Sequence, residues 1–346
     1  MQPQVPPPQP PVTATAEPPP APPPAPKPKL SDLISESMQT ALGALNAHDA
    51  TKFASVYAEN AEITVPGLND VAGRAGVLAN MNEWFQTFSK VKLGFSRVWM
   101  KDKVVVLEWV IQGTHSGEFF GVKGKDNPIG HAGLSIVTFN DDGKVQSEHR
   151  YGDLGTVASQ LGLTKEKVAP IPALPETTDV QQSKPEADAK SEALAKGALA
   201  AFEKKNPADL DAVTQEDVEY QGLLTSSSVK GRADLKKTFG TFFKAFPDAK
   251  MEPALVLGVS DYAIVEYQLK GTQQGALGPI KATKKPVSLH AVDIMQFKDG
   301  KVSRVWTFRN SAELMQQLGL FQVPVVVPGA AAKAGGTTKA PPPKKK

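Results

Sequence analysis

The strongest constraint in this sequence is an internal repeat with an offset of 157 or 158 residues. Short motifs of the first half return in register in the second half. The pairs are Gly73-Arg74-Ala75 with Gly231-Arg232-Ala233, Gly113-Thr114 with Gly271-Thr272, Phe139 with Phe297, Gly143-Lys144-Val145 with Gly300-Lys301-Val302, and Gln160-Leu161-Gly162-Leu163 with Gln317-Leu318-Gly319-Leu320. Self-similarity at a fixed offset is the signature of duplicated structural units. We therefore expect two copies of one domain of about 130 residues, enough to bury a core.

Proline-rich and polar segments mark the borders of the two copies. Residues 1–29 hold 14 prolines, and proline disfavours both helices and central strands, so 1–30 is predicted to be a disordered, semi-stiff stalk. The stretch 166–187 contains PIPALP and polar residues and is predicted to be a linker. The Ala- and Lys-rich segment 323–346 is predicted to be a disordered basic tail. The two domains are then expected at 31–165 and 188–322.

The pattern within each copy predicts an α+β fold. Ile34, Met38, Leu42 and Leu45 recur at helical spacing, and apolar runs later in the copy flank turns at 101–102 and 140–143 that are typical of hairpins. Helices followed by hairpin-connected strands indicate a curved antiparallel sheet packed on helices. We therefore expect two tandem cone-shaped α+β barrels, each with a hollow between sheet and helices.

Composition excludes several functional classes. The chain has no cysteine, which rules out disulfides, thiolate nucleophiles and cysteine zinc sites. Five histidines show no helical i, i+4 pairing, so neither a metal site nor a cofactor is expected. Lysines of the two tails account for more than the net charge of +3, so the folded part is acidic and nucleic-acid binding is not expected.

The sequence also bears on compartment. It has no apolar run of 18 residues, so an integral membrane protein is not expected. The N-terminus has no signal-peptide pattern, which favours the cytoplasm by default. A cell-envelope location is the alternative if translation starts elsewhere, and the Pro-rich stalk would then contact an envelope or protein partner.

Several segments resemble the nuclear transport factor 2-like superfamily, and within it the SnoaL-like polyketide cyclase group. In the first copy they are HDATKFASVYAENAEI, GRAGVLANMNEWF, WVIQGTHSGEFFG and HRYGDLGTVASQLG; in the second they are NPADLDAVTQEDVEY, KGTQQG, VDIMQFKDGKV and NSAELMQQLGL. The resemblance implies a cone-shaped fold that hosts cyclases, isomerases, hydrolases and binding modules. It also implies that Asp153, just before the final helix, is an acid/base in ring closure. The family usually has an aromatic residue where this chain has Gly152.

Strand alternation predicts which side chains share the first cavity. Alternate residues of a strand face the same side, which places Trp109 and His115 on one face and His149, Tyr151 and Asp153 on the corresponding face of the last strand. The apolar wall is expected from Trp84, Phe85 and Phe88. Burial would raise the pKa of Asp153 and suit it as a general base, with His115 as a donor to an enolate oxygen.

Structural roles remain open for these residues. Asp153 also fits a plain helix N-cap, and His115 also fits a partner for a buried backbone group. His131 is expected to be structural, and tryptophans at such positions are more often core than ligand platforms.

The second copy differs at the candidate site. Gln273 stands for His115, Trp306 for His149, Phe308 for Tyr151 and Asn310 for Asp153. Amides do not transfer protons near neutral pH, so the second copy is expected to be a degenerate, structural or binding domain. A pocket of its own would involve Asp293, His290, Asn310 and Trp306.

The sequence therefore predicts a tandem protein whose first pocket binds a small apolar ligand with a carbonyl group. The alternative is a cofactor-independent cyclase, isomerase or hydrolase in the first domain, with Asp153 as general acid/base and His115 beside it.

Overall fold

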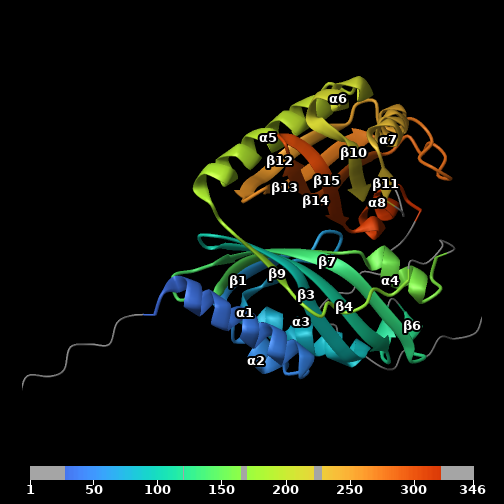
Figure 1. The fold of residues 1–346 in the computed structure, drawn as a ribbon. Coiled ribbons are helices and arrows are strands. Elements are labelled where there is room, and N and C mark those ends of the chain that lie inside the picture. The colour runs from blue at the N-terminus through green and yellow to red at the C-terminus, as the bar shows by residue number, and fades with distance from the viewer. Residues whose placement is uncertain (1–27, 120, 165–169, 222–227, 321–346) are drawn as a thin grey trace, which may run out of the picture.

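The computed structural model describes residues 28–119, 121–164, 170–221 and 228–320. The predicted stalk and tail lie almost entirely outside these ranges. Figure 1 shows two stacked domains of the same architecture. Elements of domain 1 are α1 (Leu30–Asn46), α2 (Ala50–Ala54), β1 (Tyr57–Thr64), β2 (Val71–Ala72), α3 (Gly73–Thr87), β3 (Phe88–Lys101), β4 (Val104–His115), β5 (Glu118–Phe119), β6 (Val122–Lys123), β7 (Asn127–Phe139), β8 (Val145–Gly152) and α4 (Leu154–Gln160).

Domain 2 repeats this order. Its elements are α5 (Pro185–Glu203), η1 (Pro207–Asp209), α6 (Leu210–Val213), β10 (Thr214–Gln221), β11 (Val229–Lys230), α7 (Arg232–Ala245), β12 (Lys250–Val259), β13 (Tyr262–Thr272), β14 (Pro286–Lys298), β15 (Lys301–Arg309) and α8 (Ser311–Gln317). The strand order β2-β1-β8-β7-β4-β3 in the first sheet matches β11-β10-β15-β14-β13-β12 in the second. The predicted tandem α+β fold is confirmed. Both curved sheets are open along their described edges and do not close into a barrel.

Most strand pairs are antiparallel, as the hairpin turns predict. Among the strands that the two domains share, the exceptions are β1 beside β8 and β10 beside β15, which pair in parallel because a helix and other strands separate them in the chain. A bulge near the start of β8 has a large consequence. Phe139 pairs with Val145 but Thr138 pairs with Ser147, so Gln146 has no counterpart. An extra residue on one strand reverses the alternation of all residues after it.

The predicted linker is partly packed on domain 1. Strand β9 (Asp179–Gln182) lies parallel to β3 and adds a seventh strand to the first sheet. Before it, the Gln112 side-chain amide donates to the Pro172 carbonyl at 2.6 Å and the Thr178 hydroxyl donates to the Phe95 carbonyl at 2.8 Å. Helix α5 then begins at Pro185, a residue suited to the first helical turn.

The two sheets pack against each other through their outer faces. Helices α1–α3 and α5–α7 lie on the sides away from the partner domain (Figure 1). A shared apolar cluster fills the space between the sheets; its largest members include Trp99, Leu134 and Tyr151 from domain 1 and Tyr262, Ile264 and Ile294 from domain 2. Equivalent elements meet each other: β3 contacts β12, β8 contacts β15, and α4 contacts α8.

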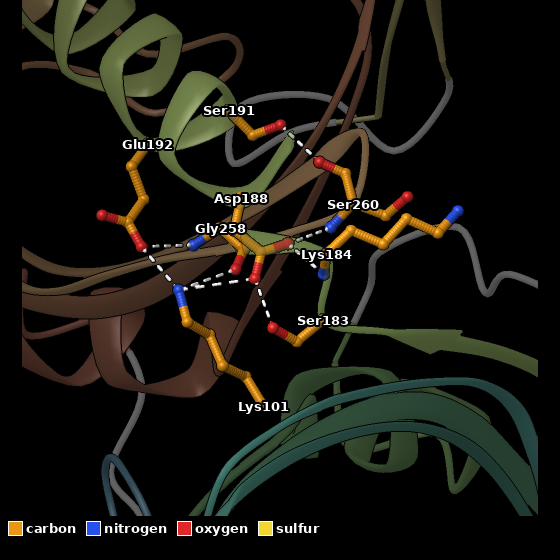
Figure 2. Close-up of polar contacts among 8 residues, drawn as sticks. All are labelled: Lys101, Ser183, Lys184, Asp188, Ser191, Glu192, Gly258 and Ser260. Carbon is orange, nitrogen blue, oxygen red and sulfur yellow. Dashed lines mark hydrogen bonds and ion pairs between the residues drawn. The ribbon is translucent and has the colours of Figure 1, made fainter. Parts of the chain in front are cut away.

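Lys101 ties the end of β3 to domain 2 (Figure 2). Its Nζ lies 3.0 Å from Glu192 Oε1, 3.6 Å from Asp188 Oδ2 and 3.3 Å from the Gly258 carbonyl. Asp188 is 1% exposed and also accepts from the backbone N–H groups of Lys184 and Ser260. Because this carboxylate is fully bonded, it fixes the start of α5 against both domains.

Candidate functional site

Domain 1 contains a cavity of about 220 Å³ between its sheet and helices. Its walls are mainly apolar side chains of α1, α3, β3 and β4; they include Met38, Ala41, Leu45, Met81, Trp84, Phe95, Leu107 and Ile111. An engineered protein cavity of about 150 Å³ accepts benzene. The cavity of domain 1 is therefore large enough for a bicyclic molecule.

An ion pair between the buried Glu148 and the half-buried Arg150 forms the polar side of this cavity. Arg150 donates from Nε to Glu148 Oε1 at 2.9 Å and from Nη2 to Oε2 at 2.8 Å. The hydroxyls of Tyr57 and Ser135 donate to the same carboxylate at 2.7 and 2.8 Å. Trp109 Nε1 donates in turn to the Ser135 hydroxyl at 3.1 Å. Glu148 is 5% exposed, and these four donors compensate the loss of water around its charge.

The electrostatics keep Glu148 ionised. Burial acts to raise the pKa of Glu148, but Arg150 and the two hydroxyls outweigh burial and hold that pKa below its usual range. Glu148 and, to a smaller extent, Tyr57 hold the pKa of Arg150 above its usual value although burial acts against it. A carboxylate of low pKa that is fully hydrogen-bonded is a weak base. Glu148 therefore serves to position Arg150.

Two groups at this end of the cavity keep hydrogen-bonding capacity. Arg150 Nη1 has no partner among the described residues, and Arg150 lines the cavity. His131, also in the lining, bonds through Nδ1 to the Ala132 carbonyl at 3.1 Å. Burial lowers the pKa of His131, so its ring is neutral near pH 7 and Nε2 is an acceptor in the tautomer that donates from Nδ1.

Glycines make room for the aromatic side chains here. A Cβ at Gly133 would lie 2.2 Å from the Trp109 ring, and a Cβ at Gly152 would lie 3.0 Å from His131 Cε1 and 3.3 Å from Trp109. Trp109 and His131 contact each other edge to face, with centroids 5.4 Å apart. They occupy the space beside Gly152, which explains why this chain has a glycine where the family usually has an aromatic residue.

The predicted pocket residues of domain 1 separate into two groups. Trp109 and Trp84 line the cavity as expected. Phe85 packs on His48 outside the cavity lining. Phe88 is fully buried behind the wall, against Trp84. His115 is 1% exposed and packs on the rings of Phe88 and Phe119. Its Nε2 is buried and has no hydrogen-bond partner among the described residues, and the side chain is not part of the cavity lining.

His149, Tyr151 and Asp153 do not face the cavity, which corrects the expectation from strand alternation. The bulge at Gln146 turns Glu148, Arg150 and Gly152 inward and the odd-numbered residues outward. His149 Nδ1 lies 2.6 Å from Glu266 Oε1 of domain 2, and the Tyr151 hydroxyl donates to the same oxygen at 2.7 Å. These two side chains therefore hold the domains together.

Asp153 is a helix cap shared between the domains. It accepts from the Gly155 N–H at 3.2 Å and the Thr156 hydroxyl at 2.7 Å within α4. It also accepts from the N–H and hydroxyl of Ser311 in domain 2 at 2.8 and 2.5 Å. Burial acts to raise its pKa, but Arg309 and these donors outweigh burial, and the pKa is lowered. The expected raised pKa of Asp153 is thus wrong.

Only one of the four residues predicted for the second pocket lines it. Asp293 faces a cavity of about 80 Å³ in domain 2. Trp306 lies at the domain interface under the guanidinium of Arg97, which is 3.7 Å from its ring centroid. Asn310 caps α8 and donates to the Pro66 carbonyl of domain 1 at 2.8 Å. His290 Nδ1 lies 2.8 Å from Glu313 Oε1.

Sequence reasoning missed Glu148, Arg150, Tyr57 and Ser135 and assigned His131 a structural role. One signal was present. Glu148 and Arg150 are two residues apart on a strand, so they share a face and carry opposite charges. Two opposite charges on the same face of a strand indicate a buried ion pair when that face packs against the core.

The pH dependence of the interface gives a first prediction. The hydrogen bond to Glu266 raises the pKa of His149, with smaller contributions from Asp70 and Glu148. A raised histidine pKa contributes stability that is present below about pH 6.5 and lost as pH rises through the folded-state value. His149→Gln should therefore lower the free energy of unfolding more at pH 5.5 than at pH 8.5.

Urea unfolding at the two pH values measures this difference, which should be under about 1 kcal/mol because the histidine is partly exposed. His290→Gln is the matched control, since hydrogen bonding to Glu313 raises the pKa of His290 within one domain. An equal loss at both pH values for His149→Gln would contradict an ionic contact with Glu266.

Comparison with known proteins identifies the family. The model of the SnoaL-like polyketide cyclase family matches residues 36–161 and again residues 193–318. The chain belongs to this family. The resemblance stated from the sequence motifs is confirmed, including the tandem arrangement. No curated protein matches the sequence.

No helix of the described residues is both long and apolar enough to cross a membrane, and the same residues contain no cluster of side chains suited to a metal ion.

Solved structures resemble single SnoaL-like domains of the chain. AclR from Streptomyces galilaeus is 18% identical, with a TM-score of 0.36, and the match covers 39% of this chain and 99% of that one. TsrD from Streptomyces laurentii is 20% identical (TM-score 0.35; 38% and 97% covered). IdmH from Streptomyces antibioticus is 24% identical (TM-score 0.34; 37% and 98% covered).

Proposed function

We propose that the SnoaL-like domain 1 is a binding domain for a small, largely apolar molecule that carries a carbonyl group. The observation that supports this most directly is the guanidinium of Arg150, which Glu148 holds in place at the end of an apolar cavity. Apolar walls give affinity, and a few fixed polar groups give orientation. Arg150 Nη1 is the donor for the ligand carbonyl.

Binding is favoured over Asp153 acid/base chemistry by the contacts of that carboxylate. All of its hydrogen bonds hold α4 and α8, and its pKa is lowered, whereas a general base works best with a pKa near the operating pH. Within the described cavity lining, Glu148 is the one carboxylate, and it is committed to Arg150. The described cavity lining thus has a strong orienting donor and no carboxylate that is free to act as a base.

A matched pair of bicyclic probes tests the proposal. 2-Acetylnaphthalene and 2-ethylnaphthalene differ by one heavy atom, the carbonyl oxygen, which gives only the ketone a hydrogen-bond acceptor. A bond to a charged donor contributes about 1.5–3 kcal/mol, so calorimetric titration should show the ketone binding about tenfold more tightly or better. The paired change Glu148→Gln with Arg150→Met should remove this preference and leave the affinity for 2-ethylnaphthalene unchanged.

Ala41 and Ala198 provide a control for location. Both lie on the first helix of their domain, 157 residues apart, and each lines the cavity of its own domain. Ala41→Phe should abolish binding of the ketone by filling the cavity of domain 1, and Ala198→Phe should leave it intact. Equal affinity for both probes, or loss of binding only with Ala198→Phe, would overturn the proposal.

A further inference from the structure

The cavity of domain 2 holds a single carboxylate in apolar surroundings. The side chains that line it are aliphatic or aromatic except for Thr214 and Asp293, and no Lys, Arg or His is among them. Asp293 lies on β14 and is 7% exposed. The Thr307 and Tyr267 hydroxyls both donate to its Oδ1, at 2.5 and 3.2 Å. Asp293 Oδ2 has no partner in the described part of the chain.

Comparison of the two repeats shows that the cavity of domain 2 has no counterpart of Arg150 at the equivalent position. Ser135 pairs with Arg150 across β7 and β8, and Asp293 pairs with Thr307 across the equivalent strands. By the same offset, Glu148 corresponds to Val305. Domain 1 therefore balances its buried carboxylate with a guanidinium, whereas domain 2 keeps a carboxylate and has a neutral residue at the position of the guanidinium.

No charged side chain of the described residues compensates the charge of Asp293. Burial raises its pKa from 3.8 to about 6, and the two hydroxyls oppose this only in part. The adjacent Tyr267 is neutral, and burial raises its pKa further. Among the described residues, the Thr307 and Tyr267 hydroxyls are the groups that oppose the effect of burial on the pKa of Asp293. In most protein molecules Asp293 is therefore ionised at neutral pH. A cation is the ligand that would stabilise this buried carboxylate most.

We propose that the domain 2 cavity binds a small organic cation, a short alkylammonium or alkylguanidinium, which takes the place that Arg150 holds in domain 1. Asp293 Oδ2 accepts from the cationic head. The rings of Tyr220 and Phe239, 5.6 Å apart in the cavity wall, offer π faces to it. A cavity of about 80 Å³ is well below the size that holds benzene, which limits the ligand to a few heavy atoms.

The test uses propylammonium chloride as the probe, with 1-propanol and sodium chloride at matched concentrations. The carboxyl carbon of Asp293 is followed by NMR in the full chain. Propylammonium should shift this signal saturably and lower the pKa of Asp293, and neither 1-propanol nor sodium chloride should do so. Asp293→Asn should weaken binding of the cation by about tenfold or more, because the charged acceptor is gone.

Two further variants separate this site from domain 1. Thr307→Arg installs the cation within the chain and should abolish propylammonium binding, as should Ala198→Phe by filling the cavity. Neither change touches the site for 2-acetylnaphthalene, so failure of one proposal does not entail failure of the other. Binding that persists unchanged in Asp293→Asn and Thr307→Arg, or a propanol effect equal to that of propylammonium, would overturn the inference.

Discussion

Asp293→Asn should stabilise the protein at pH 8 and have almost no effect at pH 4. A pKa raised from 3.8 to about 6 means that the folded state binds the proton more tightly than the unfolded state. Stability then falls as pH rises between these two values, and the full penalty is present above about pH 6. A difference of about two pKa units between the folded and unfolded states corresponds to a loss of stability of about 3 kcal/mol at most. Asparagine removes the charge and still accepts from Thr307 and Tyr267.

Unfolding in urea at pH 4, 6 and 8 measures this effect. Asp153→Asn is the matched control, because the same substitution there removes a carboxylate whose pKa is lowered. That variant should lose stability at pH 8 and nearly as much at pH 4, because the folded-state pKa of Asp153 lies below 3.8. If Asp293→Asn also lost stability at pH 8, Asp293 would not be an uncompensated buried charge.

Arg150→Met should cost about 3–5 kcal/mol of stability, the usual effect of leaving a buried charge without its partner. Glu148 would then remain in an apolar cavity with two hydroxyls as its only donors. Adding Glu148→Gln to Arg150→Met should recover most of the loss, since a buried pair replaced on both sides is often close to neutral.

A double-mutant cycle at pH 7 measures this coupling by denaturant unfolding. Thr307→Met at the equivalent strand position of domain 2 is the control, because it removes only a neutral donor to a buried carboxylate, and it should cost less than Arg150→Met. A single Arg150→Met variant as stable as the double variant would show that Glu148 is hydrated, and would remove the basis for a fixed guanidinium in the cavity.

The fold could be predicted from the sequence because its evidence is repeated. The motifs around Gly73 and Gly231, and the turns before Val145 and Val302, recur in register, and each hairpin turn gives local evidence for its strands. The resulting tandem arrangement and element order agree with the structure. These features depend on local backbone preferences and on the offset, both of which can be read from one sequence.

The site could not be predicted as well because it depends on a single residue of strand register. Gln146 is bulged out of β8, and nothing in its local sequence distinguishes it from a paired residue. Alternation without the bulge selects His149 and Tyr151 in place of Glu148 and Arg150. The same error extends to domain 2. Alternation without a bulge places Trp306 and Asn310 in the second pocket, but both residues lie at the domain interface, as their counterparts His149 and Asp153 do.

The amino-acid sequence of one strand indicates that both faces of the first sheet are buried. Strand β4 reads VVVLEWVI, with apolar residues on both of its faces, and a sheet of this kind is covered on both sides. Val105 faces the core of domain 1, and Val106 is buried against domain 2. In a single SnoaL-like domain the helices cover only one face of the sheet, and Val106 and Trp99 on the opposite face would be exposed to water. Domain 2 covers that opposite face.

The meeting of equivalent elements across the interface gives the chain the geometry of a symmetric homodimer. In a true homodimer every substitution appears twice, so both cavities must change together. Joining the subunits in one chain removes this restriction while the connection keeps their effective concentration high. Each half can then support the other's fold while its own cavity diverges, as the contrast between Arg150 and Thr307 shows.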